Sequence, residues 1–526
     1  MADLILKRFL PRIEFDSYED FRDNYKVNVP VDFNFGFDVV DAWADAEPVK
    51  KALVWCDEED NEKILTFTDI KRLSNKAANF FRDIGIKKGS VVMLILRRRW
   101  EYWICATALH KIGAVLIPGS LQLTKKDIVY RGNTAEMHTV ICVNDEFVLS
   151  QVEQAQGEVP SLKNKVVIPE KREGWLDFTE EIEKYSDEFS RPIGDEATVW
   201  DDTMLVYFTS GTTGMPKMVA HNFAYPLGHI ITAKYWQQVE EDKLHMSVSD
   251  SGWAKFGWGK IYGQWVCGAV IFAYDMEAKF TPKNLLSRIS KYKVTTFCAP
   301  PTMFRFMLQE DVSAYDLSCI HNCGIAGEPL NPEVYKKWHE LTGLKLREGF
   351  GQSEGPVLLA NFKWFEPKPG STGKPSPGYD IQLIDADGNI CEDGEEGTIA
   401  IMDVKNHPPV GLFTGYYKND EMTQDKLLGK CYDTGDVAWR DSDGYYWFVG
   451  RNDDVIKCSG YRIGPFEVES ALLEHAAVVE CARTGALDPV RGQVVKATVV
   501  LAKVYEGTPE LTKELQNYVK KVTAPY

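Results

Sequence analysis

The chain has 526 residues, of which 60 are basic and 77 acidic, so its formal net charge is -17 at pH 7. This length predicts more than one packed unit. Nucleic acid is excluded as a general partner, because a negative charge of this size repels polyanions. Hydrophobic residues make up 44% and charged residues 26%, which is typical of a globular protein.

The start of the chain, MADLILKRFLPRIEF, lacks the apolar core and cleavage site of a signal peptide. The longest apolar stretch, 103–118, is interrupted by a histidine and a lysine and does not reach the roughly 18 apolar residues of a membrane span. The eleven cysteines are scattered, and the pair that flanks His321 has no second pair at zinc-binding spacing. We therefore predict a cytoplasmic protein with reduced thiols, no membrane span and no zinc site.

Short apolar runs rich in β-branched residues recur along the first part of the chain, and amphipathic stretches such as 284–293 separate several of them. The clearest runs are 91–96, 114–118, 139–143, 204–208, 269–274 and 295–300. Strands that alternate with helices predict an α/β fold with parallel-rich sheets covered on both faces. Ligands of such folds bind beyond the carboxyl ends of strands.

The strand predicted at 204–208 runs directly into TSGTTGMPK (209–217), a stretch of glycines, hydroxyl residues and one lysine. Converging backbone N–H groups, permissive glycine dihedrals and hydroxyl donors are what a phosphate-binding loop needs. The stretch is not a Walker A loop, because Pro216 separates glycine from lysine and Met218 follows the lysine. Taken alone, the stretch also fits a solvent-exposed Ser/Thr/Gly loop.

From about Tyr379 the pattern changes to short alternating strands, and the turn DSDG (441–444) predicts a hairpin between 432–440 and 446–451. After a polar break, GPFEVESALLEH (464–475) predicts a helix, and two further strands follow it. We predict a large N-terminal domain, 1–452, with several subdomains and a small β-barrel-like part. A small α+β C-terminal domain, 453–526, follows it.

Five motifs in this order resemble those of the adenylate-forming superfamily, which contains acyl-CoA synthetases, nonribosomal adenylation domains and beetle luciferases. They are 209–217, GEP (327–329), EGFGQSEG (348–355), YDTGD (432–436) and GRNDDVIKCSGYRIGPFEVE (450–469). Within the superfamily the chain looks most similar to medium-chain acyl-CoA synthetases, on PGSLQ (118–122), SGYRIGPFEVE (459–469), DPVRG (488–492) and the ending VTAPY. The resemblance runs from about residue 60 to the end.

The resemblance implies an AMP-forming carboxylic acid–CoA ligase. In its first step a carboxylate attacks the α-phosphorus of ATP and expels pyrophosphate; in its second, the thiol of CoA attacks the acyl-adenylate and expels AMP. Catalysis then rests on charge compensation and on holding the reactants in line. ATP, Mg²⁺ and CoA are the expected cofactor and cosubstrates.

The resemblance also assigns roles around the nucleotide. Ser353 stands where threonine is usual and reaches the α-phosphate, and Glu354 is the magnesium carboxylate. Phe350 replaces the usual tyrosine and stacks on adenine without a hydroxyl, while Asp436 and Arg451 meet the ribose. The implied nucleotide residues are Thr209, Ser210, Gly211, Thr212, Thr213, Gly214, Lys217, Gly327, Glu328, Pro329, Glu348, Gly349, Phe350, Gly351, Gln352, Ser353, Asp436 and Arg451. The implied catalytic residues are Lys217, Ser353, Glu354 and Arg462.

The remaining implied roles concern the other substrates and the movement between steps. Asp453 corresponds to the hinge about which the mobile C-terminal lobe rotates. The implied CoA residues are Gln122, Ser459, Gly460, Tyr461 and Arg491. The implied acyl-pocket residues are Trp236, Trp253, Lys255, Trp258, Cys298 and Gly351. Bulky tryptophans favour a short- or medium-chain, branched or aromatic acid, unless they are ordinary core residues; the role of Lys255 is left open.

The family's adenylation lysine lies beyond a VTAPYKYPR-like segment, within which this sequence ends at Tyr526. We expect the natural chain to continue past Tyr526. Two other functions stay open: an adenylating enzyme that loads a carrier protein, against which Arg491 argues, and a catalytically silent nucleotide-binding scaffold. The partners are then a small carboxylic acid, ATP and CoA, and a homodimer is an alternative to a monomer.

Overall fold

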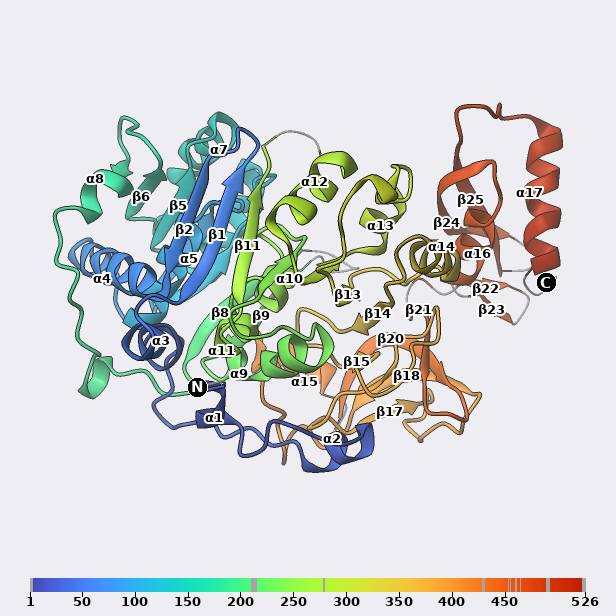
Figure 1. The fold of residues 1–526 in the computed structure, drawn as a ribbon, viewed down its shortest axis with the longest axis horizontal. Coiled ribbons are helices and arrows are strands. Elements are labelled where there is room, and N and C mark those ends of the chain that lie inside the picture. Colours follow the sequence, from blue (N-terminus) through green and yellow to red (C-terminus); the bar gives the residue numbers. More distant parts are fainter. Residues whose placement is uncertain are drawn as a thin grey trace.

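The computed structural model describes residues 3–209, 215–277, 280–427, 431–452, 454, 456–458, 461–463, 465–488 and 492–522. It confirms the predicted α/β class. Two large sheets form the N-terminal part, and the C-terminal elements project from one side of it, beside α14 (Pro332–Thr342) and β21 (Tyr446–Arg451) (Figure 1).

Nine of the described strands form the first large sheet, in which neighbours from β14 to β1 run parallel. In spatial order they are β16 (Lys374–Pro375), β15 (Leu359–Ala360), β14 (Leu346–Phe350), β13 (Asn322–Ile325), β12 (Thr296–Ala299), β10 (Leu244–Ser247), β11 (Val270–Asp275), β1 (Lys51–Asp57) and β2 (Glu62–Thr66).

Eight of the described strands form the second large sheet, which is parallel from β8 to β7 and antiparallel at the β9 edge. In spatial order they are β19 (Gly415–Tyr416), β9 (Lys217–Asn222), β8 (Thr203–Thr209), β4 (Val115–Pro118), β3 (Val91–Ile95), β5 (Thr139–Val143), β6 (Asn164–Ile168) and β7 (Leu176–Asp177). The six apolar runs of the sequence therefore correspond to β3, β4, β5, β8, β11 and β12.

Helices cover both sheets because successive strand residues point to opposite faces. On β1, Leu53 and Trp55 face the core between the two sheets, whereas Val54 and Cys56 face the helices on the other side. The helices between the sheets include α4 (Phe67–Asp83), α5 (Glu101–Ile112), α9 (Tyr225–Ile230) and α11 (Tyr262–Val266). The outer layers are α12 (Pro282–Tyr292), α13 (Pro301–Met307) and α14 on one side, and α6 (Lys125–Ala135) and α7 (Glu146–Gln156) on the other.

Four described strands form a smaller antiparallel sheet. In spatial order they are β17 (Ile381–Ile384), β18 (Glu396–Ile401), β20 (Tyr432–Arg440) and β21. The predicted hairpin is confirmed as β20 and β21, in which Asp436 pairs with Arg451.

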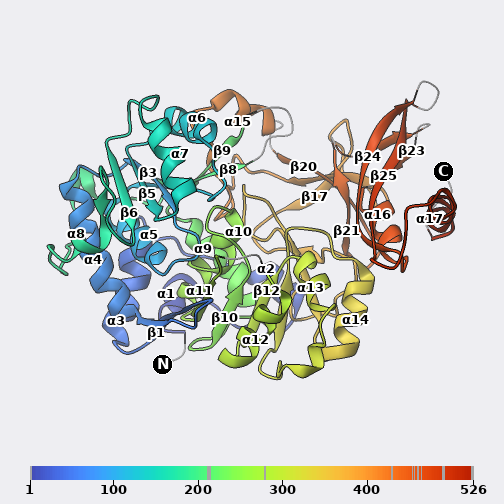
Figure 2. The ribbon, with the colours of Figure 1, turned by 90° about the horizontal axis from the view of Figure 1, so that it is seen from above.

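The C-terminal elements have a small core of their own, which includes Ile456, Ile463, Leu472 and Leu515. They are β22 (Ile456–Cys458), β23 (Tyr461–Ile463), α16 (Pro465–Leu473), β24 (Val478–Asp488), β25 (Gly492–Leu501) and α17 (Pro509–Val522). Figure 2 shows this unit at the far end of the molecule from α4 and α8 (Phe178–Ile182). A domain boundary at residue 453 stays a prediction. Within the described ranges, every helix is too short or too polar to cross a membrane.

Candidate active site

A cavity of about 490 Å³ lies where β8, β13 and β14 of the two large sheets end and the β20–β21 hairpin approaches them. This is the carboxyl edge of parallel strands, where ligands of α/β folds bind. The predicted residues that line it are Thr209, Lys217, Trp253, Lys255, Trp258, Gly327, Glu328, Pro329, Glu348, Gly349, Phe350, Gly351, Gln352, Ser353, Glu354, Asp436 and Arg451. The fold thus brings together residues of all five motifs, which lie far apart in the sequence.

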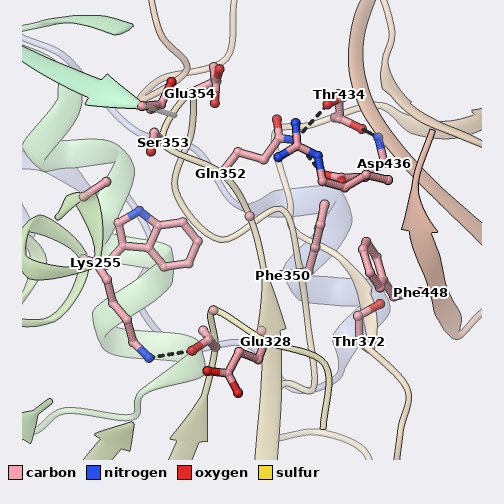
Figure 3. A pocket seen from close by; sticks show the side chains of 18 of the residues that line it. Lys255, Glu328, Phe350, Gln352, Ser353, Glu354, Thr372, Thr434, Asp436 and Phe448 are labelled. Carbon is pink, nitrogen blue, oxygen red and sulfur yellow. Dashed lines mark hydrogen bonds between the residues drawn. The ribbon is translucent and has the colours of Figure 1, made fainter. Parts of the chain in front are cut away.

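One end of the cavity carries a hydrogen-bonded group centred on Gln352 (Figure 3). Its side-chain amide donates to the Asp436 carboxylate at 2.5 Å and to the Thr434 carbonyl at 2.8 Å, and its amide oxygen accepts from the Tyr432 hydroxyl at 2.9 Å. Asp436 is almost fully buried, and this burial raises its pKa to about 6. A carboxylate held in this way can accept hydrogen bonds from a sugar's hydroxyl groups.

Beside this group two phenylalanine rings and a tight turn form a slot. Phe350 and Phe448 face each other with centroids 5.9 Å apart, and both lie near Thr372 in Figure 3. Gly327 has a φ of 104°, which favours glycine at the start of the GEP turn. Glu348 accepts the Leu330 backbone N–H at 3.2 Å, and burial raises its pKa to about 8. These flat and mostly apolar surfaces suit a planar heterocycle.

The cavity is also lined by Glu354, Lys217 and Ser353. The Tyr416 hydroxyl donates to Glu354 Oε1 at 3.0 Å, while burial raises the pKa of this glutamate. Lys217 begins β9, and its Nζ lies 5.5 Å from the centroid of the Tyr416 ring. The carbonyl of Ser353 bonds His221 Nε2 at 2.7 Å, which indicates a protonated Nε2 on a histidine that burial keeps neutral at a pKa of about 4.

This donor set fits Mg²⁺. Glu354 offers a partly buried hard oxygen, and the hydroxyl residues Thr209 and Ser353 line the same cavity. The charges of Lys217 and Lys426, which lie near Glu354, would compensate only part of a nucleotide's negative charge. Magnesium in proteins is typically held by one or two carboxylates together with substrate phosphates.

The predicted acyl walls are set by close contact between tryptophans and glycines. A Cβ on Gly349 would lie 2.5 Å from Trp236 Cε2, and a Cβ on Gly351 would lie 2.3 Å from Trp258 Cη2. Trp258 lines the cavity, whereas Trp236 is fully buried behind it and donates from Nε1 to the Arg347 carbonyl at 3.0 Å. Only glycine at these two positions leaves room for both indoles.

The other predicted acyl residues differ in their surroundings. Trp253 is 60% exposed at the rim, and Cys298 is fully buried next to Gly324, away from the cavity surface. Lys255 is half-buried and donates from Nζ to the Ala326 carbonyl at 2.5 Å, so it ties α10 (Ala254–Gly259) to the GEP turn. Burial lowers its pKa.

Some of the predicted site residues do not line this cavity, and others lie outside the described residues. Gln122 is exposed and does not line the cavity. Tyr461 and Arg462 belong to β23, and their contacts with substrate stay predictions. Ser210, Gly211, Thr212, Thr213, Gly214, Asp453, Ser459, Gly460 and Arg491 lie outside the described residues.

Sequence reasoning missed several lining residues: Ala254, Ala326, Thr372, Tyr416, Lys426, Tyr432, Thr434 and Phe448. For two of them the signal was present. Tyr432, Thr434 and Asp436 alternate along β20, so Asp436 in the cavity implies that the other two face it as well. Tyr416 and Lys426 carry no such signal, because only the fold brings them next to Glu354.

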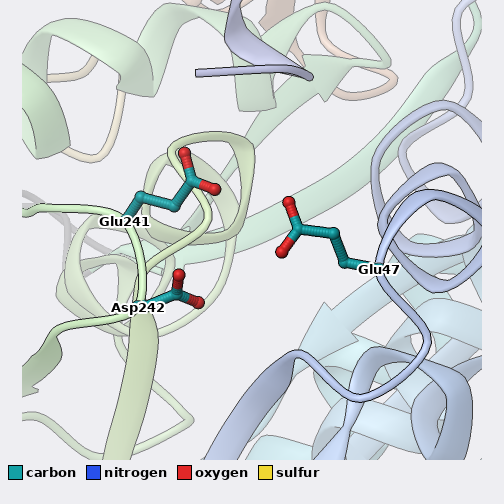
Figure 4. A group of neighbouring side chains, drawn as sticks. All are labelled: Glu47, Glu241 and Asp242. Atoms are coloured by element: carbon teal, nitrogen blue, oxygen red, sulfur yellow. The ribbon is translucent and has the colours of Figure 1, made fainter. Parts of the chain in front are cut away.

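A second group of carboxylates, Glu47, Glu241 and Asp242, converges outside this cavity (Figure 4). The ammonium of Lys50 lies 2.6 Å from Asp242 Oδ1, 3.0 Å from Glu241 Oε1 and 3.6 Å from Glu47 Oε2. A lysine thus already supplies the positive charge that would balance this group, which joins the start of β1 to the start of β10.

The family model of the AMP-binding enzymes matches residues 40–417, and that of the AMP-binding enzyme C-terminal domain matches residues 467–526. The human "Acyl-coenzyme A synthetase ACSM3, mitochondrial" is 40% identical over 522 residues, which cover 97% of this chain and 88% of that protein. The human "Acyl-coenzyme A synthetase ACSM4, mitochondrial" is 42% identical over 508 residues, covering 95% and 86%.

Two solved structures are similar over nearly the whole chain. An anthranilate CoA ligase, AuaEII, in complex with anthranoyl-AMP superposes with a TM-score of 0.85 at 26% identity, covering 95% of this chain and 92% of that one. An acyl-CoA synthetase from Brucella canis superposes with a TM-score of 0.76 at 30% identity, covering 96% and 93%.

Proposed function

Because this chain belongs to the AMP-binding enzyme family, we propose that its cavity joins a carboxylic acid to AMP and then transfers the acyl group to CoA. The protein is an AMP-forming acid–CoA ligase. Loading of a carrier protein and a silent scaffold are less favoured, since the relatives named above are acyl-CoA synthetases and a CoA ligase.

One observation carries the proposal: a single cavity has a polar end that suits a nucleotide and an indole-lined end that suits an acid. Asp436 and Gln352 lie at the first end and Trp258 at the second, with Gly351 between the two in the sequence and on the wall. In this arrangement the carboxylate of the acid meets the α-phosphate at the point where the two ends join.

In the first step the residues of the cavity bind and orient ATP. We assign the ribose to Asp436 and Arg451, adenine to the slot at Phe350, the α-phosphate to the Ser353 hydroxyl and the distal phosphates to Lys217. The Lys217 ammonium offsets the charge of the departing pyrophosphate. Glu354, with the hydroxyls beside it, would hold Mg²⁺, which when bound neutralises phosphate charge.

In the second step the thiol sulfur of CoA attacks the acyl carbonyl, and the bond from that carbon to the AMP oxygen breaks. We assign the pantetheine arm to Ser459, Gly460 and Tyr461, a CoA phosphate to Arg491 and a weaker contact to Gln122. Arg462 then meets the AMP phosphate, and Asp453 serves as the hinge. These roles rest on the motifs alone.

The acid is short- or medium-chain, branched or aromatic. The support is the packing of Trp258 against Gly351, which closes the cavity on that side, and the rim position of Trp253. Trp236 and Cys298 support this wall from behind.

The test uses acid-dependent exchange of pyrophosphate into ATP by the protein extended past Tyr526, across acids of two to twelve carbons, branched and aromatic acids included. Formation of acyl-CoA from a synthetic acyl-adenylate and CoA tests the second step by itself. We expect both activities with at least one acid. Absence of exchange with every acid of the panel refutes the ligase function.

We keep a cytoplasmic location as the proposal, with mitochondria as the alternative that the names of the relatives suggest. Cell fractionation decides between them. A homodimer is likewise a proposal, which sedimentation of the purified protein tests.

A further inference from the structure

We propose that Tyr416 is a positioning residue that fixes both charged groups of the first step, Glu354 through its hydroxyl and Lys217 through its ring. This inference rests on the proposed function, in which these two groups meet the metal and the distal phosphates. The sequence motifs do not include Tyr416.

The segment that carries Tyr416 holds Glu354 at two points. The Tyr416 hydroxyl donates to Glu354 Oε1 at 3.0 Å, and the Phe413 backbone N–H donates to the Glu354 carbonyl at 2.7 Å. Main chain and side chain of the glutamate are therefore both tied to residues 413–416. One carboxylate oxygen is engaged by the tyrosine, which sets the direction of the other.

The same tyrosine packs against the lysine of the phosphate-loop motif. Lys217 Nζ lies 5.5 Å from the ring centroid, which is within the range of a cation–π contact. β19 pairs with β9, on which Lys217 lies, and Tyr416 pairs with Val219 in that register. Strand pairing thus places the Tyr416 ring beside the strand that begins with Lys217.

The ring itself is held firmly. Tyr416 is 4% exposed, and its ring meets that of Phe413 at a centroid distance of 5.3 Å. Its backbone N–H donates to Thr423 Oγ1 at 2.9 Å, which ties the strand to α15 (Asp420–Lys426). Tyr416 is therefore fixed by its strand pairing, by the Phe413 ring and by Thr423. A side chain fixed in this way can orient two charged neighbours with little loss of entropy when the ligand binds.

The role is one of orientation, because the Tyr416 hydroxyl contacts the carboxylate of Glu354. Its loss would misdirect a carboxylate that burial already disfavours in its charged form. Metal binding in the presence of ATP should therefore suffer more than ATP binding itself.

The test is metal binding by the chain as it stands. Electron paramagnetic resonance of Mn²⁺, titrated in the presence of ATP, reports the affinity of the ternary site without any turnover. For Tyr416→Phe we expect about a tenfold weaker Mn²⁺ affinity, which is the size of one hydrogen bond to a charged group. ATP affinity without metal should stay unchanged, since the ring over Lys217 remains. Tyr417→Phe is the matched control; it removes a neighbouring hydroxyl and should match the native chain.

A coupling measurement separates orientation from a merely structural effect. In a Glu354→Gln background the hydroxyl of Tyr416 no longer has a carboxylate to direct, so the added Tyr416→Phe change should leave Mn²⁺ affinity where Glu354→Gln alone puts it. Tyr416→Leu, which also removes the ring, should weaken ATP binding without metal about threefold.

The outcomes are distinct. Unchanged Mn²⁺ affinity in Tyr416→Phe, or full additivity with Glu354→Gln, overturns the role of Tyr416 while the ligase function stands. A native chain that fails to bind Mn²⁺ and ATP together overturns the proposed nucleotide site itself.

Discussion

The two ends of the cavity are built on different physical principles. At the nucleotide end, side chains such as Gln352, Asp436 and Glu354 are held by directed hydrogen bonds of 2.5–3.0 Å. At the acyl end, Trp258 is held mainly by shape, against a glycine that leaves no room for a Cβ. Trp236 packs on Gly349 in the same way, and its Nε1 also donates to the Arg347 carbonyl. Replacing a polar side chain removes its hydrogen bond altogether, whereas substitutions in an apolar wall change the shape of the cavity in small steps. We therefore expect changes at the first end to abolish a step and changes at the second to alter which acid is used.

The largest loss of activity at the nucleotide end is expected from Glu354→Ala. It removes the proposed metal carboxylate and leaves the Tyr416 hydroxyl without its partner. We expect magnesium-dependent turnover to fall about 1000-fold, the upper range for loss of one charge-stabilising group, while the melting temperature stays near that of the native protein. Steady-state turnover against Mg²⁺ concentration measures the effect. Turnover close to native would remove Glu354 from the metal site.

A smaller loss is expected from Asp436→Asn. The amide of the variant keeps only one acceptor oxygen, so one of the two hydrogen bonds to the ribose is lost. We therefore expect ATP affinity to fall about 30-fold, within the range for one charge-assisted hydrogen bond. We expect the variant to fold as the native protein does. Because burial raises the pKa of Asp436 from 3.8 to about 6, the folded chain loses stability as pH rises between these two values, and the loss is complete above pH 6. Calorimetric ATP binding and melting at pH 8 check both points; a less stable variant with native ATP affinity would contradict the assignment.

The comparison also explains what could be predicted from the sequence. Asp436, Glu354 and the GEP turn lie in short motifs whose chemistry is local, and the strands were visible as apolar runs. Tyr416 escaped prediction because its role depends on the pairing of β19 with β9, which is a long-range contact. Phe448 lies on the predicted hairpin, but only the fold brings its ring opposite that of Phe350. The acyl wall was only partly predictable: the tryptophans were named, but only packing shows that Trp258 lines the cavity and Trp236 lies behind it.

At the acyl end, Trp258→Ala should enlarge the cavity. The indole that now packs on Gly351 is removed, so acids two to four carbons longer, or with larger rings, gain space. We expect kcat/KM for such acids to rise about tenfold relative to the best short acid, within the range that pocket contacts supply, with ATP affinity unchanged. A panel of acids measures the ratio. Trp200→Ala, an exposed tryptophan away from the cavity, is the control. A change in ATP affinity without a change in acid preference would mean that the two ends are not separate.

The smallest expected effect is a pH dependence confined to the ribose site. Burial raises the pKa of Asp436 to about 6, against the opposing effects of Gln352, Arg451 and Lys426, while Glu354 adds to the rise. The charged form accepts hydrogen bonds from the ribose and exists above this value, so affinity should rise as pH rises through 6 and then level off. Between pH 5.5 and pH 7 we expect about a fourfold gain. Adenosine is the probe, because it has no phosphate that titrates in this range, and Glu348 titrates only near pH 8. Two results would assign the ribose contact to another group. One is an adenosine affinity that does not change with pH in the native chain, and the other is a pH dependence that persists in Asp436→Asn.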